Sequence, residues 1–124
     1  MVLVVALALA APARAADDYA NYFNAMVRLY ESLEYERALE QLDKAHKYSR
    51  GTDDDVALAL YEGMIRSDLG QNDQARAAFK TALLLRPDVN FPVKVSPKVR
   101  NTFEDLRKAV KKELAPLIEK QKAE

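Results

Sequence analysis

The side chains best suited to acid–base chemistry are few, and they lie in surface-type surroundings. His46 is the only histidine, and lysines stand near it at positions 44 and 47. An imidazole in such a stretch is typical of a solvated helix surface. Tyr35 beside Glu36 is better explained by packing at a turn than by proton transfer. Other carboxylates alternate with Lys and Arg as surface ion pairs do, and no Ser or Thr stands in a nucleophile elbow or phosphate loop. We therefore expect no catalytic residue, no cofactor and no enzymatic activity.

Three consecutive aspartates, Asp53–Asp55, are the only cluster that resembles a metal-binding sequence. A calcium loop of the EF-hand type also needs a central glycine and a distal glutamate, which are absent here. The chain has no cysteine, so neither a disulfide nor a thiolate ligand can form. Thr52 followed by carboxylates instead favours a helix start, where hydroxyl capping and the helix dipole are both stabilising. We expect no metal site.

Charge is unevenly distributed along a chain whose net charge is zero. Residues 16–93 carry nine basic and fourteen acidic side chains, a net charge of −5, whereas residues 94–124 carry nine basic and five acidic ones, a net charge of +4. An acidic body argues against binding to nucleic acid. The basic tail fits a solvated helix surface, with contact to a membrane surface or to an acidic partner as the alternative.

The first fifteen residues have the pattern of a secretory signal peptide. Met1–Ala11 is an unbroken apolar run, followed by Pro12 and a small-x-small site at Ala13–Ala15. The run is shorter than the roughly 20 residues that span a bilayer. A buried N-terminal helix is the alternative, although no polar residue gives the run an amphipathic face. We expect cleavage after Ala15 and a mature protein that is periplasmic or secreted and not transmembrane.

Apolar residues recur at helical spacing from Tyr19 onward and predict an all-α chain of five helices. Asp17 or Asp18 is the expected N-cap of the first helix. Gly70 suits the C-terminal end of the third helix and Ser96-Pro97 the start of the fifth, which Pro116 should end or kink. The third helix should run from about Asp53 to Leu69 and the fourth from about Asn72 to Leu85. The apolar stripes that predict the first, second and fifth helices are, in order, Tyr22, Met26, Leu29 and Leu33; Ala38, Leu39, Leu42 and Ala45; and Val99, Phe103, Leu106 and Val110.

The first two helices are repeated in the next two. Gly63 is followed at fixed offsets by Ala75, Phe79, Ala82 and Pro87, and the same offsets in the first pair give Met26, Ala38, Leu42, Ala45 and Arg50. Small residues let two helices cross closely while a large one fills the space beside them. The pattern resembles the tetratricopeptide repeat family, most closely over residues 69–87. The spacing from Ala38 to Ala75 is 37 residues, against about 34 in that family.

This resemblance implies a right-handed α–α superhelix of two helix-turn-helix units plus a C-terminal capping helix. The expected organisation is a signal peptide (1–15), a repeat domain (16–88), an extended linker (89–96) and a capping helix with a basic tail (97–124). The first unit departs from the family pattern, because Met26 replaces a small residue and Arg50 replaces proline. Two units are fewer than the three that usually form a stable stack, so the last helix is expected to complete it.

In this family the first helix of each pair lines a concave groove that binds another protein. The resemblance places eight residues in such a groove: Phe23, Asn24, Val27, Tyr30, Leu60, Tyr61, Met64 and Ser67. This surface is largely apolar and suits a peptide segment or amphipathic helix of a partner. Only Asn24 could take part in a carboxylate clamp, so we do not expect one. The fifth helix or a second copy of the chain could equally cover the groove, which leaves a homo-oligomer open.

These patterns lead to two hypotheses of function. The first is a non-catalytic, periplasmic protein–protein interaction module, an adaptor or assembly factor of a cell-envelope complex. The second is a cell-wall or membrane-surface binding module that acts through the basic C-terminal tail. The sequence does not identify the partner or the pathway.

Overall fold

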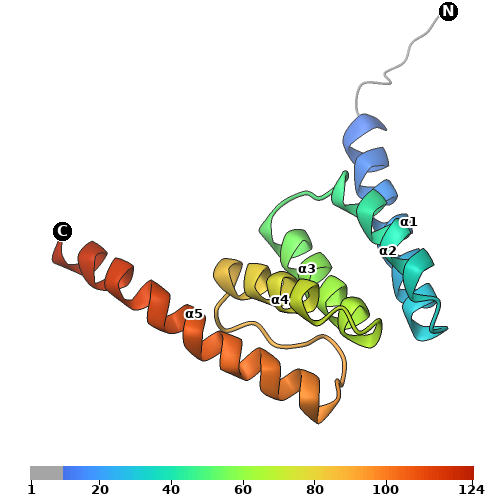
Figure 1. Cartoon of the computed structure of the whole chain (residues 1–124). Helices are drawn as coiled ribbons and strands as arrows, with labels where there is room; N and C mark the ends of the chain where they lie inside the picture. The colour runs from blue at the N-terminus through green and yellow to red at the C-terminus, as the bar shows by residue number, and fades with distance from the viewer. Residues whose placement is uncertain (1–9) are drawn as a thin grey trace, which may run out of the picture. The chain divides into compact units, whose positions relative to one another are not determined.

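Helices make up all of the regular structure in residues 10–124, the part of the chain that the computed structural model describes (Figure 1). The expected all-α class is therefore confirmed for these residues. The chain divides into two compact units, one ending at Arg50 and the other comprising Gly51–Glu124. Unit 1 contains α1 (Ala10–Glu31) and α2 (Tyr35–His46), and unit 2 contains α3 (Thr52–Asp68), α4 (Asn72–Leu85) and α5 (Pro97–Ala123).

Unit 1 is a helical hairpin in which α1 packs against α2. Its buried side chains come from one face of each helix, as the 3.6-residue period predicts; they are Tyr19, Met26, Ala38, Leu42 and Ala45. Aromatic pairs extend this core toward the surface. Tyr22 stacks on Tyr48 with 5.7 Å between ring centroids, and the guanidinium of Arg50 lies over the ring of Tyr19 at 4.9 Å.

The first helix begins earlier than the sequence predicts. Asp17 and Asp18 were expected to cap it, but α1 starts at Ala10 and runs through both residues. Pro12 lies within α1 and does not interrupt it over the described residues. Residues 1–9 of the expected signal peptide lie outside the described residues.

The turns that close the two hairpins have the same geometry, 37 residues apart. After α1, the amide of Leu33 donates to the carbonyl of Tyr30 (3.0 Å) and that of Glu34 to Leu29 (2.8 Å). After α3, the amide of Gly70 donates to Ser67 (3.0 Å) and that of Gln71 to Arg66 (2.8 Å). This pair of bonds forms a Schellman motif, which needs a left-handed residue; Leu33 has φ 62° and Gly70 φ 76°. The predicted cap at Gly70 is confirmed, whereas Leu33, expected in an apolar stripe, is the exposed turn residue.

The core of unit 2 is built where α3 crosses α4. A Cβ atom at Gly63 would lie 2.8 Å from Cζ of Phe79, so the missing side chain makes room for that ring. Phe79 in turn contacts Phe91 and Phe103 edge-on, with centroids 5.6 and 5.5 Å away. These rings join α3, α4, the connector after α4 and the first half of α5. The small-and-large arrangement expected from the repeat is therefore present in this pair.

The ends of the unit 2 helices agree with the sequence at most positions. The Oγ of Ser96 accepts a hydrogen bond from the amide of Val99 (3.2 Å), as expected of an N-cap. Thr52 was predicted as a cap, but it is the first residue of α3, and Gly51 holds the cap position. Pro116 does not end α5, which continues to Ala123. The carbonyl that Pro116 leaves without a helical donor belongs to the exposed Lys112, where water can replace the lost bond.

Candidate interaction surfaces

The eight residues expected in the concave groove differ in their exposure. Phe23, Val27 and Tyr30 on α1 are half-buried and Asn24 is exposed. On α3, Ser67 is half-buried, whereas the other three side chains are buried, namely Leu60, Tyr61 and Met64. The accessible members of the set are therefore mainly those on α1. That the two rows face one groove stays a prediction.

The residues singled out for chemistry are arranged as surface groups. Asp53 forms an ion pair with Arg86 (2.7 Å between Oδ1 and Nη1), which joins the start of α3 to the end of α4. His46 is exposed at the end of α2. Within residues 10–124, no cluster of three His, Asp or Glu side chains is placed to hold a metal ion.

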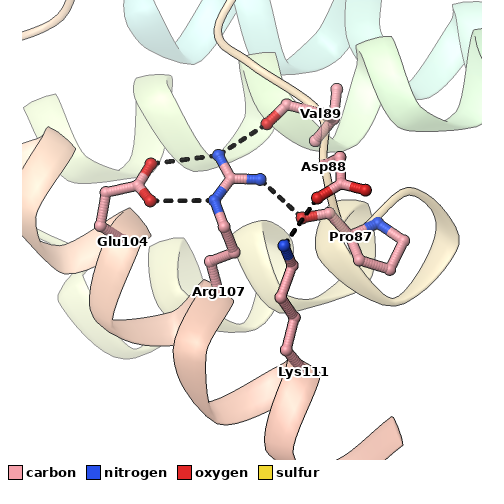
Figure 2. A network of polar contacts seen from close by, with 6 residues as sticks. All are labelled: Pro87, Asp88, Val89, Glu104, Arg107 and Lys111. Carbon is pink, nitrogen blue, oxygen red and sulfur yellow. Dashed lines mark hydrogen bonds and ion pairs between the residues drawn. The ribbon is translucent and has the colours of Figure 1, made fainter. Parts of the chain in front are cut away.

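Arg107 fastens the connector that follows α4 to the side of α5 (Figure 2). Its guanidinium donates to the carbonyls of Pro87 (2.6 Å) and Val89 (2.8 Å). It also pairs with Glu104 one turn earlier, at 2.9 and 3.0 Å, and lies over the ring of Phe103 at 5.1 Å. The side chain is only 13% exposed, so these bonds form where few waters compete. We call Arg107 with Pro87, Val89 and Glu104 the Arg107 clasp.

A second ion pair lies beside the clasp. The Nζ of Lys111 is 2.7 Å from Oδ1 of Asp88. The hydrogen bond and the charge of Lys111 hold the pKa of the Asp88 carboxyl below its ordinary value. The hydrogen bond from Arg107 likewise lowers the pKa of Glu104. Both carboxyls are ionised at neutral pH and support the attachment of the connector to α5.

The second half of α5 extends past the end of α4 (Figure 1). An apolar groove opens there, next to this ion pair. It has a volume of about 320 Å³, and apolar side chains line most of it: Pro87, Leu114, Ala115 and Ile118. Ile118 and its neighbour Leu117 are 47% and 59% exposed. All buried residues of α5 lie in the first half, up to Val110. We call the groove together with Leu117 the α5 end surface.

Sequence reasoning treated the basic tail as one feature and so missed its division of roles. Arg107 stands four residues after Phe103, and Lys111 four after that, along the edge of the buried stripe. This spacing places both cations where α5 meets its neighbours. The position of each cation relative to the buried stripe could have predicted that Arg107 and Lys111 contact the rest of the unit, whereas the number of charges could not.

None of the helices in the described part of the chain is long and apolar enough to cross a membrane.

Comparison of the chain with protein-family models, with curated proteins and with solved structures found no match.

Proposed function

We propose that this protein is a non-catalytic interaction module of the tetratricopeptide type, which serves as an adaptor or assembly factor of a cell-envelope complex. The observation that carries the proposal is the α5 end surface. Leu114, Leu117 and Ile118 recur at helical spacing, and two of them are about half exposed. A sizeable exposed apolar patch on a helix is typical of a contact site for another molecule.

The charges around this surface indicate the chemistry of the partner. Lys120 and Lys122 flank the apolar stripe at helical spacing, and neither forms an ion pair with any residue in the range 10–124. An amphipathic helix with acidic residues beside its apolar face would match both features. We propose such a helix, supplied by another protein, as the occupant.

The repeat and the N-terminal segment support the setting of the proposal. Two hairpins closed by the same hydrogen bonds 37 residues apart fit a tandem helical repeat, a class of fold that commonly binds proteins. Cleavage after Ala15 would leave in the mature chain every buried residue that the structure describes, because the first of them is Tyr19. It would also place Asp17 and Asp18 in the first turn of α1, where the helix dipole favours them.

A binding experiment with designed peptides tests the proposal. We expect a fluorescent helical peptide with a leucine face and glutamate flanks to bind the mature chain saturably, and the same peptide with lysine flanks to bind more weakly. Leu117→Ser combined with Ile118→Ser should weaken binding about tenfold, since roughly half of each side chain is left to bury. Leu33→Ser is the matched control, because it removes an exposed leucine from unit 1.

The outcome of this experiment separates the two candidate surfaces. Unchanged affinity of the α5 double variant would contradict the assignment to the α5 end surface. If Val27→Ser alone abolished binding, the partner would instead use the groove expected on α1. Circular dichroism of each variant establishes that the fold is retained.

The same surface supports one alternative, contact with an anionic membrane surface. A helix with an apolar stripe and flanking lysines can lie in the headgroup region of a bilayer. Vesicles of phosphatidylglycerol and phosphatidylcholine are the probe. Membrane binding predicts that the chain sediments with them and that removal of residues 114–124 abolishes this. Sedimentation that does not depend on the anionic lipid, or on those residues, would eliminate the alternative.

A further inference from the structure

A second pocket in unit 2 is lined by polar side chains without partners. It lies where α3 ends and where α4 and α5 begin, with a volume of about 130 Å³. Phe79 and Val99 contribute apolar wall. The polar side chains that line it are Ser67, Asn72, Arg76, Lys98 and Thr102. None of these five side chains makes a hydrogen bond or ion pair with another residue of the described chain.

The charge of this pocket is positive. Arg76 and Lys98 bring two cations to it, and neither Asp nor Glu is among the residues that line it. The later cations of α4 and its C-terminal cap have partners, because Lys80 pairs with Glu113 and Arg86 pairs with Asp53. The two cations at the pocket are therefore available to a ligand.

The backbone adds to the same potential. Asn72 is the first residue of α4, and Lys98 and Val99 belong to the first turn of α5. Residues from the N-terminal turns of both helices, where the helix dipole places partial positive charge, therefore line the pocket. Hydroxyls from Ser67 and Thr102 and the amide of Asn72 supply further donors.

We propose that this pocket binds a single oxyanion group, a carboxylate or a phosphate. A guanidinium, an ammonium, two hydroxyls and an amide around one small space match the acceptor oxygens of such a group and leave little for a cation or an apolar ligand. About 130 Å³ holds roughly four waters at about 30 Å³ each, which is enough for one such group with a water. The site is distinct from the α5 end surface and does not depend on the proposed function.

Nuclear magnetic resonance titration of the ¹⁵N-labelled chain tests the site. Sodium phosphate and sodium acetate are added separately at constant ionic strength, with sodium chloride as the reference. We expect the amide signals of Asn72, Val99 and Thr102 to shift saturably. Arg76→Gln and Lys98→Gln should each weaken binding about tenfold, because each removes a charge-assisted hydrogen bond. Lys112→Gln, which removes an unpaired cation elsewhere on α5, should leave it unchanged.

The results identify the ligand class or reject the site. Tighter saturation by phosphate would assign a phosphate group, and equal or tighter saturation by acetate would assign a carboxylate. Shifts that rise linearly without saturation, or that match those given by chloride, would overturn the proposal. Saturable binding that Arg76→Gln and Lys98→Gln do not weaken would also overturn it, because the ligand would then bind elsewhere.

Discussion

The close approach of Gly63 to Phe79 leads to a stability prediction of unusual sign. Alanine is normally better than glycine inside a helix by about 1 kcal/mol. At position 63, however, the added methyl would come within 3.0 Å of the Phe79 ring. The ring cannot move freely because Phe91 and Phe103 hold it edge-on. Overpacking of this kind costs about 1–3 kcal/mol, so Gly63→Ala should be neutral to destabilising by about 2 kcal/mol in spite of the better helix propensity.

A double-mutant cycle separates the steric effect from the others. Phe79→Leu alone leaves a cavity and should destabilise the chain by about 1–3 kcal/mol. In the presence of Phe79→Leu, the methyl of Gly63→Ala has space, and the variant should recover its propensity advantage. The coupling between the two changes should therefore equal the overpacking cost, about 1–3 kcal/mol. Urea unfolding followed by circular dichroism measures all four chains.

Two results would refute this reasoning. One is additivity of the two substitutions within about 0.5 kcal/mol, the range expected for independent sites. The other is a Gly63→Ala variant that is more stable than the parent chain by the full alanine advantage. Either would mean that the ring is not held against the helix backbone.

Further predictions concern the turns and the Arg107 clasp. Glycine adopts positive φ without strain, unlike leucine or alanine. Leu33→Gly should therefore stabilise unit 1 by about 0.5–1 kcal/mol, and Gly70→Ala should destabilise unit 2 by about 1 kcal/mol. Urea unfolding measures both changes. Arg107→Met should lower the free energy of unfolding by about 2–3 kcal/mol, because it removes two charged hydrogen bonds to backbone carbonyls. Thermal or urea unfolding measures this. The control Lys108→Met, at an exposed position, should change the free energy of unfolding by no more than about 0.5 kcal/mol. The pKa of Glu104 in the folded chain lies below its ordinary value of 4.5. The ionised carboxyl therefore contributes fully to the stability of the fold above that pH, and this contribution is lost as the pH falls through the folded pKa. The drop in stability between pH 7 and pH 3 should accordingly be smaller for Glu104→Gln, and an unchanged drop would show that this carboxyl is not responsible.

Helix positions could be predicted because the signals are local. The span of α4, Asn72–Leu85, is the predicted one, since Gly70 and Pro87 mark its two sides. The errors arose where two local signals competed. Asp17 is a good cap, yet the alanine-rich stretch before it also favours helix, and α1 continues through it. Pro116 was expected to end or kink α5; the helix does not end there and continues to Ala123.

The turn of the first hairpin shows that residue type alone can conceal information that the sequence repeat contains. The 37-residue offset that relates Ala38 to Ala75 also relates Leu33 to Gly70, so the repeat itself carried the information. Leucine rarely adopts positive φ, and an apolar stripe was the more probable interpretation of that residue type alone. Hydrogen-bond partners of side chains are harder still to predict from the sequence, because Arg107 donates to carbonyls that lie eighteen and twenty residues away along the chain.

The tail of the chain shows why net charge alone gives an incomplete account of function. Lys98 lies at the polar pocket, Arg107 and Lys111 fasten the connector, and Lys120 and Lys122 follow the apolar stripe. A deletion that began at Arg107 would remove the clasp and the buried Val110 together with the exposed end, so loss of binding would report unfolding. A deletion that begins at Leu114 keeps the clasp and removes the exposed stripe, because all buried residues of α5 lie before it. The structure therefore provides a boundary, between Glu113 and Leu114, at which the stabilising role of α5 and its proposed binding role can be measured separately.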